Sequence, residues 1–360
     1  MSDVLNFDSQ ALLAQARAAR DRSDIAALAL AADALLRLNP RDPRALVLKG
    51  DALMGQGDHR SAVSFYGAAL TQGRAVSSPA PDLRAELERA SRAQAEGARR
   101  FEQGLRDGLG ARGFDPVSSS ARFAASLDLM TGRRRLYYQQ PKFYMFPGLP
   151  QIEFQPRETI AWLAKVETAA PAIRAELDAI LAEPTLFAPY VEDRANRPKS
   201  DQAGMLDNAA WSAVFLWKDG AEVPEIAARC PETMKALAEA PLCRIPGRSP
   251  SILFSKLQAG AKIPPHHGLI NPRLICHLPL IAPPGSHFRV GGEVREWREG
   301  QAWAFDDTIE HEASNDSGHD RTILIFDVWK PEITSEEQDL IRALFATIDA
   351  AGGGAPKLGV

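Results

Sequence analysis

The sequence predicts an α+β protein, with a helical N-terminal region followed by a β-rich C-terminal region that closes into a barrel or sandwich. Residues 9–74 are rich in Ala and Leu and break at Asn39-Pro40 and Gly55-Gln-Gly57, as short helices joined by tight turns do. Residues 82–108 have the charge-rich pattern of a connecting helix. From Ser251 onward, short β-like runs alternate with Gly, Pro, Asn and Asp turns.

The helical region has a period of 34 residues. Its second unit has small and aromatic residues where a tetratricopeptide repeat packs its helices, namely Gly50, Gly57, Ala62, Tyr66 and Ala69. The first unit keeps Ala16 at the position equivalent to Gly50 but fits less well. Three repeats are normally needed for a stable stack, so residues 9–74 are expected to lean on the next part of the chain. A partner-binding groove and a plain helical bundle both remain open.

The middle of the chain predicts one more helix after an aromatic, Pro-rich stretch at residues 137–154. This helix is expected from about Pro156 to Ala182, because Glu183-Pro184 then ends it. Near the C-terminus, Thr334-Ser-Glu-Glu337 is a capping-box pattern that opens a last helix to about Ala350, followed by a Gly-rich tail.

Six β-like runs predict the strands of the C-terminal region, at residues 251–257, 273–281, 287–290, 293–297, 301–305 and 321–329. Val290-Gly-Gly-Glu-Val294 has the pattern of a hairpin turn between two of them. Six strands at this spacing suggest a barrel or sandwich.

Composition excludes several classes of protein. The chain has 360 residues, 45% of them hydrophobic, and a formal net charge of −4 without a basic run, so nucleic acid is not an expected partner. No leader pattern and no stretch of roughly 20 apolar residues is present, so we expect a cytoplasmic protein without membrane attachment. Three cysteines without a C-x-x-C arrangement indicate reduced thiols rather than a zinc site.

Six of the seven histidines lie between positions 266 and 319. A non-haem Fe(II) oxygenase needs two imidazoles on one face of the metal, usually with a carboxylate as third ligand. His266 follows a Pro-Pro turn, and His311 lies 45 residues later beyond another strand, as in a small β-barrel that gathers distant residues at its mouth. Arg321 begins the strand that returns from His311, and its guanidinium could bind a 2-oxoacid carboxylate with two parallel hydrogen bonds. The sequence does not fix the strand register, so the face of the sheet on which Arg321 lies stays open.

Three segments carry a family resemblance: "PHHGLINPRLICHLPL", "GGEVREWREGQAWAFDDTIEHEASN" and "RTILIFDVWKPEIT". They resemble the aspartyl/asparaginyl β-hydroxylase family of Fe(II)- and 2-oxoglutarate-dependent oxygenases. The resemblance extends upstream through "FYMFPGLPQIEF" and "WSAVFLWKDG". It implies a double-stranded β-helix of the jelly-roll or cupin type, and a tetratricopeptide-like region before the oxygenase is similar to the animal members.

The resemblance also implies roles for particular residues. The iron ligands fall on His266 and His311, and the 2-oxoglutarate carboxylate partner falls on Arg321. Other co-substrate contacts fall on Trp211, Ser255 and His277. The position two after His266, where most 2-oxoglutarate oxygenases have Asp or Glu, is Gly268, and this family is known for that omission.

Several positions depart from the family pattern, among them Ile275, His267 and Leu257, which replaces a methionine. An arginine near the co-substrate or substrate in the animal enzyme corresponds to Ile275, but Arg273 lies two residues away on the same strand and therefore on the same face. We therefore count Arg273 among the residues expected to bind the co-substrate. His267 replaces a residue that is not a ligand and raises the possibility of a shifted ligand.

The polar residues around these motifs have simpler expected roles. Asp306 and Asp307 are expected to cap the turn before His311 rather than to act as ligands or bases. His287 and His319 are expected at the surface. For Arg321, the alternative role is a salt bridge with Glu310 or Glu312, which lie beside His311.

The resemblance implies a dioxygenase that uses Fe(II), 2-oxoglutarate and O2 to hydroxylate a C–H bond, with the β-carbon of an Asp or Asn residue in a peptide or protein as the first expectation. The alternatives are a free amino acid or amino-acid-derived metabolite as substrate, or a non-catalytic interaction protein that binds a protein partner through its repeats. The expected layout is tetratricopeptide-like helices over 9–74, connecting helices and a linker over 75–136, the oxygenase domain over 137–335, and a C-terminal helix and tail over 336–360.

Overall fold

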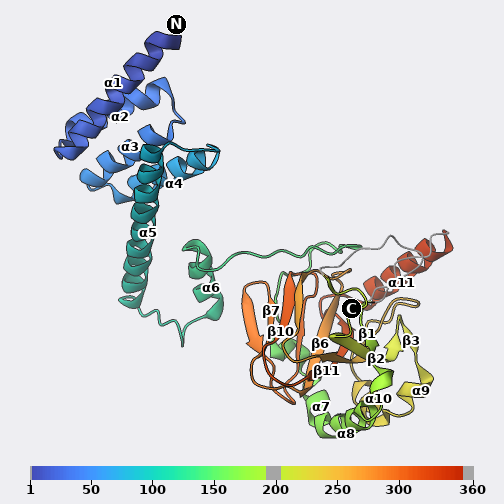
Figure 1. Ribbon diagram of the computed structural model, residues 1–360. Helices are drawn as coiled ribbons and strands as arrows, with labels where there is room; N and C mark the ends of the chain where they lie inside the picture. The colour runs from blue at the N-terminus through green and yellow to red at the C-terminus, as the bar shows by residue number, and fades with distance from the viewer. Residues whose placement is uncertain (1, 192–203, 352–360) are drawn as a thin grey trace. The chain divides into compact units, whose positions relative to one another are not determined.

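A computed structural model describes residues 2–191 and 204–351 of the chain. The chain divides into two compact units, Met1–Arg134 and Arg135–Val360, and each unit is described by itself (Figure 1). Within the described ranges, none of the helices combines the length and apolar character that crossing a bilayer requires.

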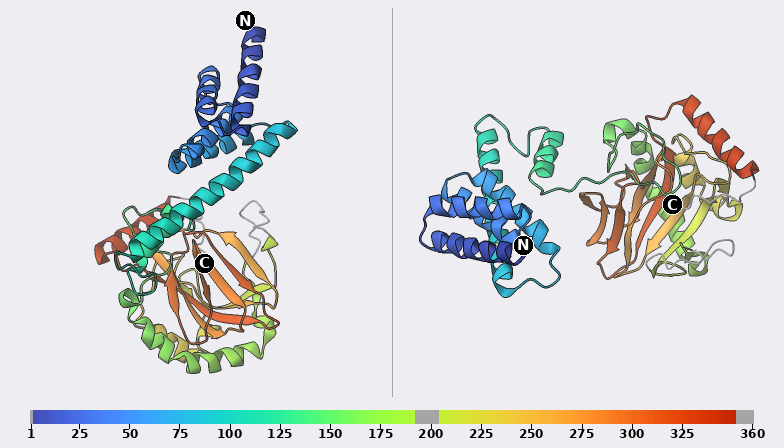
Figure 2. Two further views of the ribbon diagram at one scale, coloured as in Figure 1. Left: turned by 90° about the vertical axis from the view of Figure 1, so that its left-hand side faces the viewer. Right: turned by 90° about the horizontal axis from the view of Figure 1, so that it is seen from above.

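The first unit consists of helices. In chain order they are α1 (Ser2–Asp21), α2 (Ile25–Leu38), α3 (Pro43–Gly55), α4 (His59–Arg74), α5 (Pro81–Gly110) and α6 (Ala121–Met130). Consecutive helices from α1 to α5 pack side by side, with α5 as the long straight helix of the unit (Figure 2).

Aspartates set the starts of three of these helices. The carboxylates of Asp24, Asp42 and Asp58 accept hydrogen bonds from backbone N–H groups in the first turns of α2, α3 and α4. The helices α2 and α3 end at Leu38 and Gly55, which confirms the two predicted breaks. The predicted connecting helix over 82–108 is confirmed as α5.

Close packing of α3 on α4 depends on Gly50. A Cβ built at Gly50 would lie 2.5 Å from a ring atom of Tyr66, which is far inside normal contact distance. The ring cannot move away freely, because Tyr66 is 2% exposed and its hydroxyl donates a 2.7 Å hydrogen bond to Asp51. Ala62 and Ala69 are buried on the same helix, so the small and aromatic residues of the second repeat unit pack together. The tetratricopeptide assignment itself stays a prediction.

Ion pairs attach the start of α5 to the preceding helices. Arg89 of α5 pairs with Asp51 of α3 at 2.6 Å, and Arg20 of α1 pairs with Glu86 of α5 at 2.7 Å. Asp51 is 8% exposed at its side chain and Glu86 is 12% exposed, so these pairs are less screened than ordinary surface pairs. The helices within residues 9–74 therefore pack against the helix that follows them, as expected.

The second unit begins its helical layer with three short pieces instead of one helix. They are the 3₁₀ turn η1 (Arg157–Ile160), α7 (Leu163–Thr168) and α8 (Ala170–Leu181), so the prediction of one continuous helix from 156 to 182 is wrong. Pro171 explains the break between α7 and α8, because it has no N–H to donate and its ring crowds the preceding turn. Further short elements of this unit are η2 (Pro184–Leu186), α9 (Pro224–Ala227) and α10 (Pro231–Leu237).

Eleven strands form two antiparallel sheets in this part of the described chain. The larger sheet has the order β1-β2-β4-β11-β6-β9, with β3 paired to β2, and the smaller sheet has the order β5-β10-β7-β8. The strands are β1 (Ala188–Pro189), β2 (Trp211–Lys218), β3 (Ala221–Glu222), β4 (Ile252–Leu257), β5 (Lys262–His266), β6 (Arg273–Ile281), β7 (Ser286–Val290), β8 (Glu293–Glu296), β9 (Trp303–Phe305), β10 (His311–Asn315) and β11 (Arg321–Trp329).

All six predicted β-like runs are strands, namely β4, β6, β7, β8, β9 and β11. The predicted hairpin turn is also confirmed, because Val290 pairs with Glu293 across it. Sequence patterns did not predict β2, β5 and β10 as strands, and β5 and β10 prove to carry the two histidines of the candidate site.

Two apolar cores position the sheets. The larger sheet packs one face against α7, α8 and α10, with Ile173, Leu177 and Phe326 in that core (Figure 1). Its other face packs against the smaller sheet, and Ile323 and Phe288 lie between the sheets. This confirms the predicted sandwich, with the cupin-like arrangement of a double-stranded β-helix.

The C-terminal helix α11 (Ser335–Ala350) is confirmed together with its capping box. Thr334 accepts from the Glu337 N–H, and the Glu337 carboxylate accepts from the Thr334 N–H. Ile341 and Phe345 of α11 are buried in a cluster with Trp329.

We predict that Gly50→Ala destabilises the first unit by about 1–3 kcal/mol, because the added methyl group meets the fixed ring of Tyr66. The matched control is Gly104→Ala in α5, where a Cβ would have no neighbour within 4 Å. Replacing this helical glycine with alanine is expected to raise the free energy of unfolding by up to about 1 kcal/mol. Urea unfolding of both variants measures the difference, and equal stability of the two would contradict the packing described for α3 and α4.

Candidate active site

His266 and His311 face each other across two neighbouring strands. They are directly opposed residues of β5 and β10, and their ring centroids are 4.1 Å apart. His311 is 7% exposed, and His266 is partly buried at the end of β5. A pair of imidazoles this close, brought together by antiparallel pairing, can present two nitrogens to one ion.

Backbone carbonyl groups fix the orientation of both rings. The Nδ1 atom of His266 lies 2.8 Å from the carbonyl oxygen of Pro264, and Nδ1 of His311 lies 3.0 Å from that of Ile309. A carbonyl oxygen only accepts, so each Nδ1 carries the proton and donates. The Nε2 atom of each ring is therefore left with its lone pair, which is the tautomer that a metal ligand needs.

Burial keeps both imidazoles neutral. It lowers the pKa of His266 and lowers that of His311 well below the usual value, and the neighbouring His266 depresses the pKa of His311 further. A neutral imidazole at neutral pH can bind a cation without first losing a proton.

No space remains for a third ligand side chain at position 268. A Cβ built on Gly268 would lie 2.1 Å from Oδ2 of Asp307. That carboxylate is held by Arg273 at 3.1 Å, and the Gly268 N–H donates to the Asp307 carbonyl oxygen at 2.6 Å. Oδ1 of Asp307 is buried without a partner, and burial raises the pKa of Asp307 to about 6. The glycine is thus required by the packing of Asp307.

The two aspartates before His311 therefore have different roles. Asp306 caps the turn as expected, because Oδ1 accepts from the N–H and the hydroxyl of Thr308. Its other oxygen accepts from Lys330 at 2.5 Å and Gln139 at 2.6 Å. For Asp307 the expectation of a turn cap is wrong, because its side chain faces Gly268 instead.

Arg321 is a buried cation for which residues 2–191 and 204–351 supply no counter-ion. It is 1% exposed, its guanidinium lies 4.5 Å from the centroid of Trp297, and its Nε and Nη1 atoms have no hydrogen-bond partner. The alternative salt bridge does not form, since Glu310 and Glu312 both pair with Arg289. Burial lowers the pKa of Arg321 to about 9, so it remains charged at neutral pH.

The register places the other expected co-substrate residues on the same inner face of the larger sheet. Ser255 of β4 accepts a 3.1 Å hydrogen bond from the indole N–H of Trp211 of β2. His277 of β6 is 5% exposed, and its ring lies 4.8 Å from Phe305 and 4.9 Å from Phe288. Burial lowers the pKa of His277 well below its usual value, and the charge of Arg321 adds to this. Its Nδ1 atom has no partner.

Arg273 lies at the start of β6 and is fully buried, but two carboxylates already neutralise its charge. It pairs with Asp307 at 3.1 Å and with Asp327 at 3.3 Å. Asp327 also accepts hydrogen bonds from Ser249 and from the Ser251 N–H. A co-substrate contact for Arg273 stays a prediction. In the structure, Arg273 holds the Asp307 carboxylate against Gly268.

The remaining histidines do not join the pair. His267 follows the last residue of β5, and its Nε2 atom is buried without a partner. His287 and His319 are exposed, as expected. Within residues 2–191 and 204–351, no group of three or more His, Cys, Asp or Glu side chains is arranged to hold a metal.

Sequence reasoning assigned residues 137–154 to the oxygenase domain but did not predict that they contact the site. The Gln140 N–H donates to the Thr308 carbonyl oxygen at 2.7 Å, just before His311. The Lys142 N–H donates to the Gly268 carbonyl oxygen at 3.1 Å, just after His266. The aromatic, Pro-rich stretch at 137–154 therefore contacts the loops of both histidines, and its unusual composition was the signal available.

Comparisons with known proteins cover the part of the chain that contains this site. Residues 167–331 match the family described as Aspartyl/Asparaginyl beta-hydroxylase. An ornithine lipid ester-linked acyl 2-hydroxylase of Rhizobium tropici is 34% identical over 48% of this chain and 59% of its own length. The Homo sapiens aspartate beta-hydroxylase domain-containing protein 2 is 27% identical over 58% of this chain and 55% of its own length.

The Homo sapiens aspartyl/asparaginyl beta-hydroxylase is 34% identical over 44% of this chain and 20% of its own length. The matches thus cover less than two thirds of each of these relatives. The matched residues include both histidines, Gly268 and Arg321. The C-terminal half of this chain therefore contains an aspartyl/asparaginyl β-hydroxylase family domain.

Proposed function

We propose that this chain is an Fe(II)- and 2-oxoglutarate-dependent dioxygenase that hydroxylates a C–H bond. The observation that carries the proposal is the buried guanidinium of Arg321, which has no counter-ion among the residues that the structure describes and lies in the same interior as two facing imidazoles. An unpaired buried charge destabilises a folded protein, so its presence calls for an anionic ligand.

The histidine pair fits a ferrous ion. His266 and His311 would bind it through their Nε2 atoms, because both Nδ1 atoms already donate to carbonyl oxygens. Two protein ligands leave several positions open for a co-substrate, for oxygen and for water. When bound, the iron supplies the activation of oxygen that C–H oxidation requires.

Arg321 fits the distal carboxylate of 2-oxoglutarate. Its guanidinium can donate two parallel hydrogen bonds, and the hydroxyl of Ser255 lies on the neighbouring strand of the same sheet. The ring of Trp297 closes one side of the guanidinium at 4.5 Å. The low-dielectric surroundings strengthen the attraction between this cation and a carboxylate, so Arg321 can position the 2-oxoacid group toward the histidines.

For the substrate, we propose the β-carbon of an Asp or Asn residue in a peptide or protein. The family description and the name of the human relative support this. We propose that the helical first unit helps to receive the polypeptide. The name of the Rhizobium tropici relative supports a second candidate, an acyl chain. A free amino acid or amino-acid-derived metabolite is the third.

A non-catalytic interaction protein is disfavoured by the same charge. In a barrel that served only as a scaffold, a buried arginine without a partner would lower stability. Replacing that arginine with an apolar side chain would be expected to stabilise the fold. Arg273, by contrast, is a buried cation that two carboxylates, those of Asp307 and Asp327, neutralise.

We predict that His311→Ala and Arg321→Ala abolish turnover for different reasons. His311→Ala should lower succinate formation at least roughly 100-fold, because one iron ligand is lost. Arg321→Ala should weaken 2-oxoglutarate binding roughly 100-fold or more, because two charge-assisted hydrogen bonds are lost. Arg321→Lys should recover only part of that affinity, since an ammonium cannot make the two parallel bonds.

Succinate release with Fe(II), ascorbate and 2-oxoglutarate measures the first effect, and anaerobic titration of 2-oxoglutarate measures the second. His319→Ala and Arg122→Ala are the matched controls, because both residues are exposed. Wild-type protein that bound neither Fe(II) nor 2-oxoglutarate under anaerobic conditions would sink the assignment.

We further predict that Gly268→Asp does not create a three-ligand iron site. The new side chain would meet the Asp307 carboxylate, so the variant should lose about 1–3 kcal/mol of stability and show no gain in Fe(II) affinity. Gly318→Asp is the control, because a Cβ there has no neighbour within 4 Å. Thermal unfolding and anaerobic Fe(II) titration decide the matter, and tighter Fe(II) binding at unchanged stability would show that the position has room for a ligand.

A further inference from the structure

The guanidinium of Arg321 has an aromatic ring where another buried arginine of this protein also has a carboxylate. Arg248 lies over the ring of Phe345 at 4.9 Å, and it pairs with Asp349 at 2.5 Å as well. Arg321 lies over the ring of Trp297 at 4.5 Å, and no carboxylate of the described residues pairs with it. Within the described part of the chain, Trp297 is therefore the contact that stabilises the charge of Arg321.

A ring and a carboxylate leave different parts of a guanidinium free. A carboxylate accepts hydrogen bonds from the N–H edge of the guanidinium, whereas a ring attracts the cation through the negative charge of its face. A planar guanidinium can therefore lie on a ring and keep its N–H groups for a ligand. The Nε and Nη1 atoms of Arg321 have no partner, as this arrangement requires. Trp297 thus holds the cation without using the donors that a 2-oxoacid carboxylate needs.

The ring of Trp297 is itself fixed by its neighbours. Trp297 is 2% exposed, and its backbone N–H donates to the carbonyl oxygen of Ser286 in the smaller sheet at 3.2 Å. The ring centroid of Phe288 lies 5.3 Å from that of Trp297, and the ring of Trp303 stacks on it at 6.1 Å with an interplanar angle of 20°. A ring packed in this way presents its face to Arg321, a residue of the larger sheet, in one orientation.

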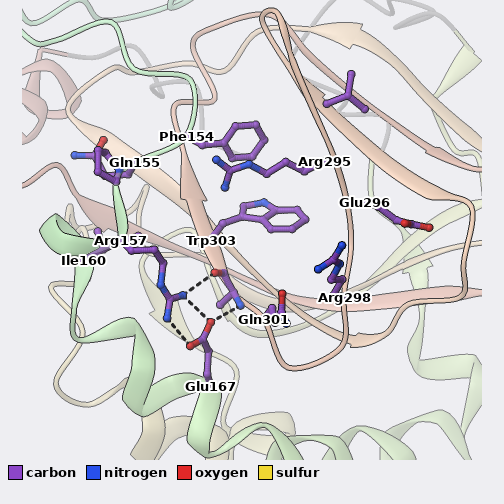
Figure 3. A pocket seen from close by; sticks show the side chains of 13 residues that line it. Phe154, Gln155, Arg157, Ile160, Glu167, Arg295, Glu296, Arg298, Gln301 and Trp303 are labelled. Carbon is purple, nitrogen blue, oxygen red and sulfur yellow. Dashed lines mark hydrogen bonds and ion pairs between the residues drawn. The ribbon is translucent and has the colours of Figure 1, made fainter. Parts of the chain in front are cut away.

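The row of aromatic rings continues beyond Trp303. The rings of Phe154 and Trp303 meet edge to face, with centroids 5.8 Å apart, and the guanidinium of Arg295 lies 3.8 Å from the centroid of Phe154. Figure 3 shows these three side chains together, where they line a hollow of about 740 Å³. The lining of the hollow includes neither Trp297 nor Arg321, and both are almost fully buried. Exclusion of water strengthens the attraction between a cation and a ring.

The ring face, rather than the indole N–H, is what Trp297 contributes to this contact. The Nε1 atom of Trp297 is buried and has no partner among the described residues. Within the described residues, no ring contact joins Trp297 to His266 or His311. Loss of the ring is therefore expected to act on Arg321 and not on the histidine pair.

We propose that Trp297 is a positioning residue for the co-substrate. Its ring takes the place of a counter-ion and holds the Arg321 guanidinium in the orientation that binds the distal carboxylate of the 2-oxoacid. Holding the guanidinium before the co-substrate arrives lowers the entropy cost of binding. This inference rests on the proposed function, because it takes 2-oxoglutarate as the ligand of Arg321. It adds that co-substrate affinity depends on a ring that acts through the arginine.

The test is anaerobic calorimetric titration of the full-length protein, loaded with Mn(II) in place of Fe(II), with 2-oxoglutarate. Trp297→Leu removes the ring face and should weaken 2-oxoglutarate binding roughly 10- to 30-fold, the effect of losing a desolvated contact between a cation and a ring. Trp297→Phe keeps a ring face and removes the N–H, so its affinity should stay within about fivefold of wild type. The Mn(II) affinity of both variants should equal that of wild type.

The matched control is Trp217→Leu. The ring of Trp217 also lies under an arginine, Arg244 at 5.1 Å, but Arg244 is exposed and Trp217 packs against the core on the helix side of the larger sheet. This variant should leave the affinity for 2-oxoglutarate unchanged. Circular dichroism checks the fold of each variant, and Trp297→Phe tests the proposal even if Trp297→Leu is unstable, because its affinity must then stay near that of wild type.

The outcomes separate this inference from the proposed function. Wild-type protein that bound no 2-oxoglutarate would overturn the proposed function and this inference with it. If wild type binds 2-oxoglutarate and Trp297→Leu binds it equally well, the inference alone is wrong. Parallel loss of Mn(II) and 2-oxoglutarate affinity would show a merely structural role for Trp297. Equal losses in the Phe and Leu variants would show that the indole N–H matters and not the ring face, which also contradicts the proposal.

Discussion

The unpaired charge of Arg321 is the constraint on which the rest of this site depends. Within the described residues, the other fully buried cations have acidic partners: Arg273 pairs with Asp307 and Asp327, Lys330 with Asp306, and Arg248 with Asp349. Pairing is the usual condition for burying a charge, because the desolvation cost is otherwise not offset. Arg321 breaks this pattern inside the same sandwich. Its hydrogen-bonding atoms without partners, and the two neutral imidazoles in the same interior, are the observations on which the proposed co-substrate and metal rest.

The two sheets contribute different parts of the site. The smaller sheet supplies the histidines, because β5 and β10 pair with His266 opposite His311. The larger sheet supplies Arg321 and Ser255 from adjacent strands, on the face that turns toward the smaller sheet. Residues far apart in the sequence thus meet because two sheets pack face to face. A change that shifted β11 by one residue would move Arg321 to the opposite face, under the helices, since alternate side chains point in opposite directions.

Local sequence patterns predicted the parts of this arrangement that depend on neighbouring residues, and missed the parts that depend on strand pairing. Continuous apolar runs predicted β6 and β11 with their observed limits, and the capping box predicted α11. The strand β5 was missed because Pro264 and Pro265 weaken any strand pattern, and β10 because its alternation of His, Ala and Asn is too polar to indicate a buried face. The face of Arg321 could not be fixed without the register. Asp307 was misjudged because only the folded chain shows that its carboxylate occupies the space beside Gly268.

The charged and polar side chains that hold the loop before His311 are paired with one another, unlike the guanidinium of Arg321, for which the described residues supply no partner. Asp306 is satisfied by Gln139, Lys330 and Thr308, so its network can fix the loop before His311 to the segment that starts at residue 137. Asn271 extends this network by donating to the Gln139 side chain and accepting from the Phe146 N–H. Every member of this network has a partner, which is the condition under which buried polar groups make a structure rigid. This network lies at the Trp329 end of β11, because Lys330 follows that strand, whereas Arg321 is its first residue. It therefore orders the loop before His311, and the guanidinium of Arg321 is positioned separately, over the ring of Trp297.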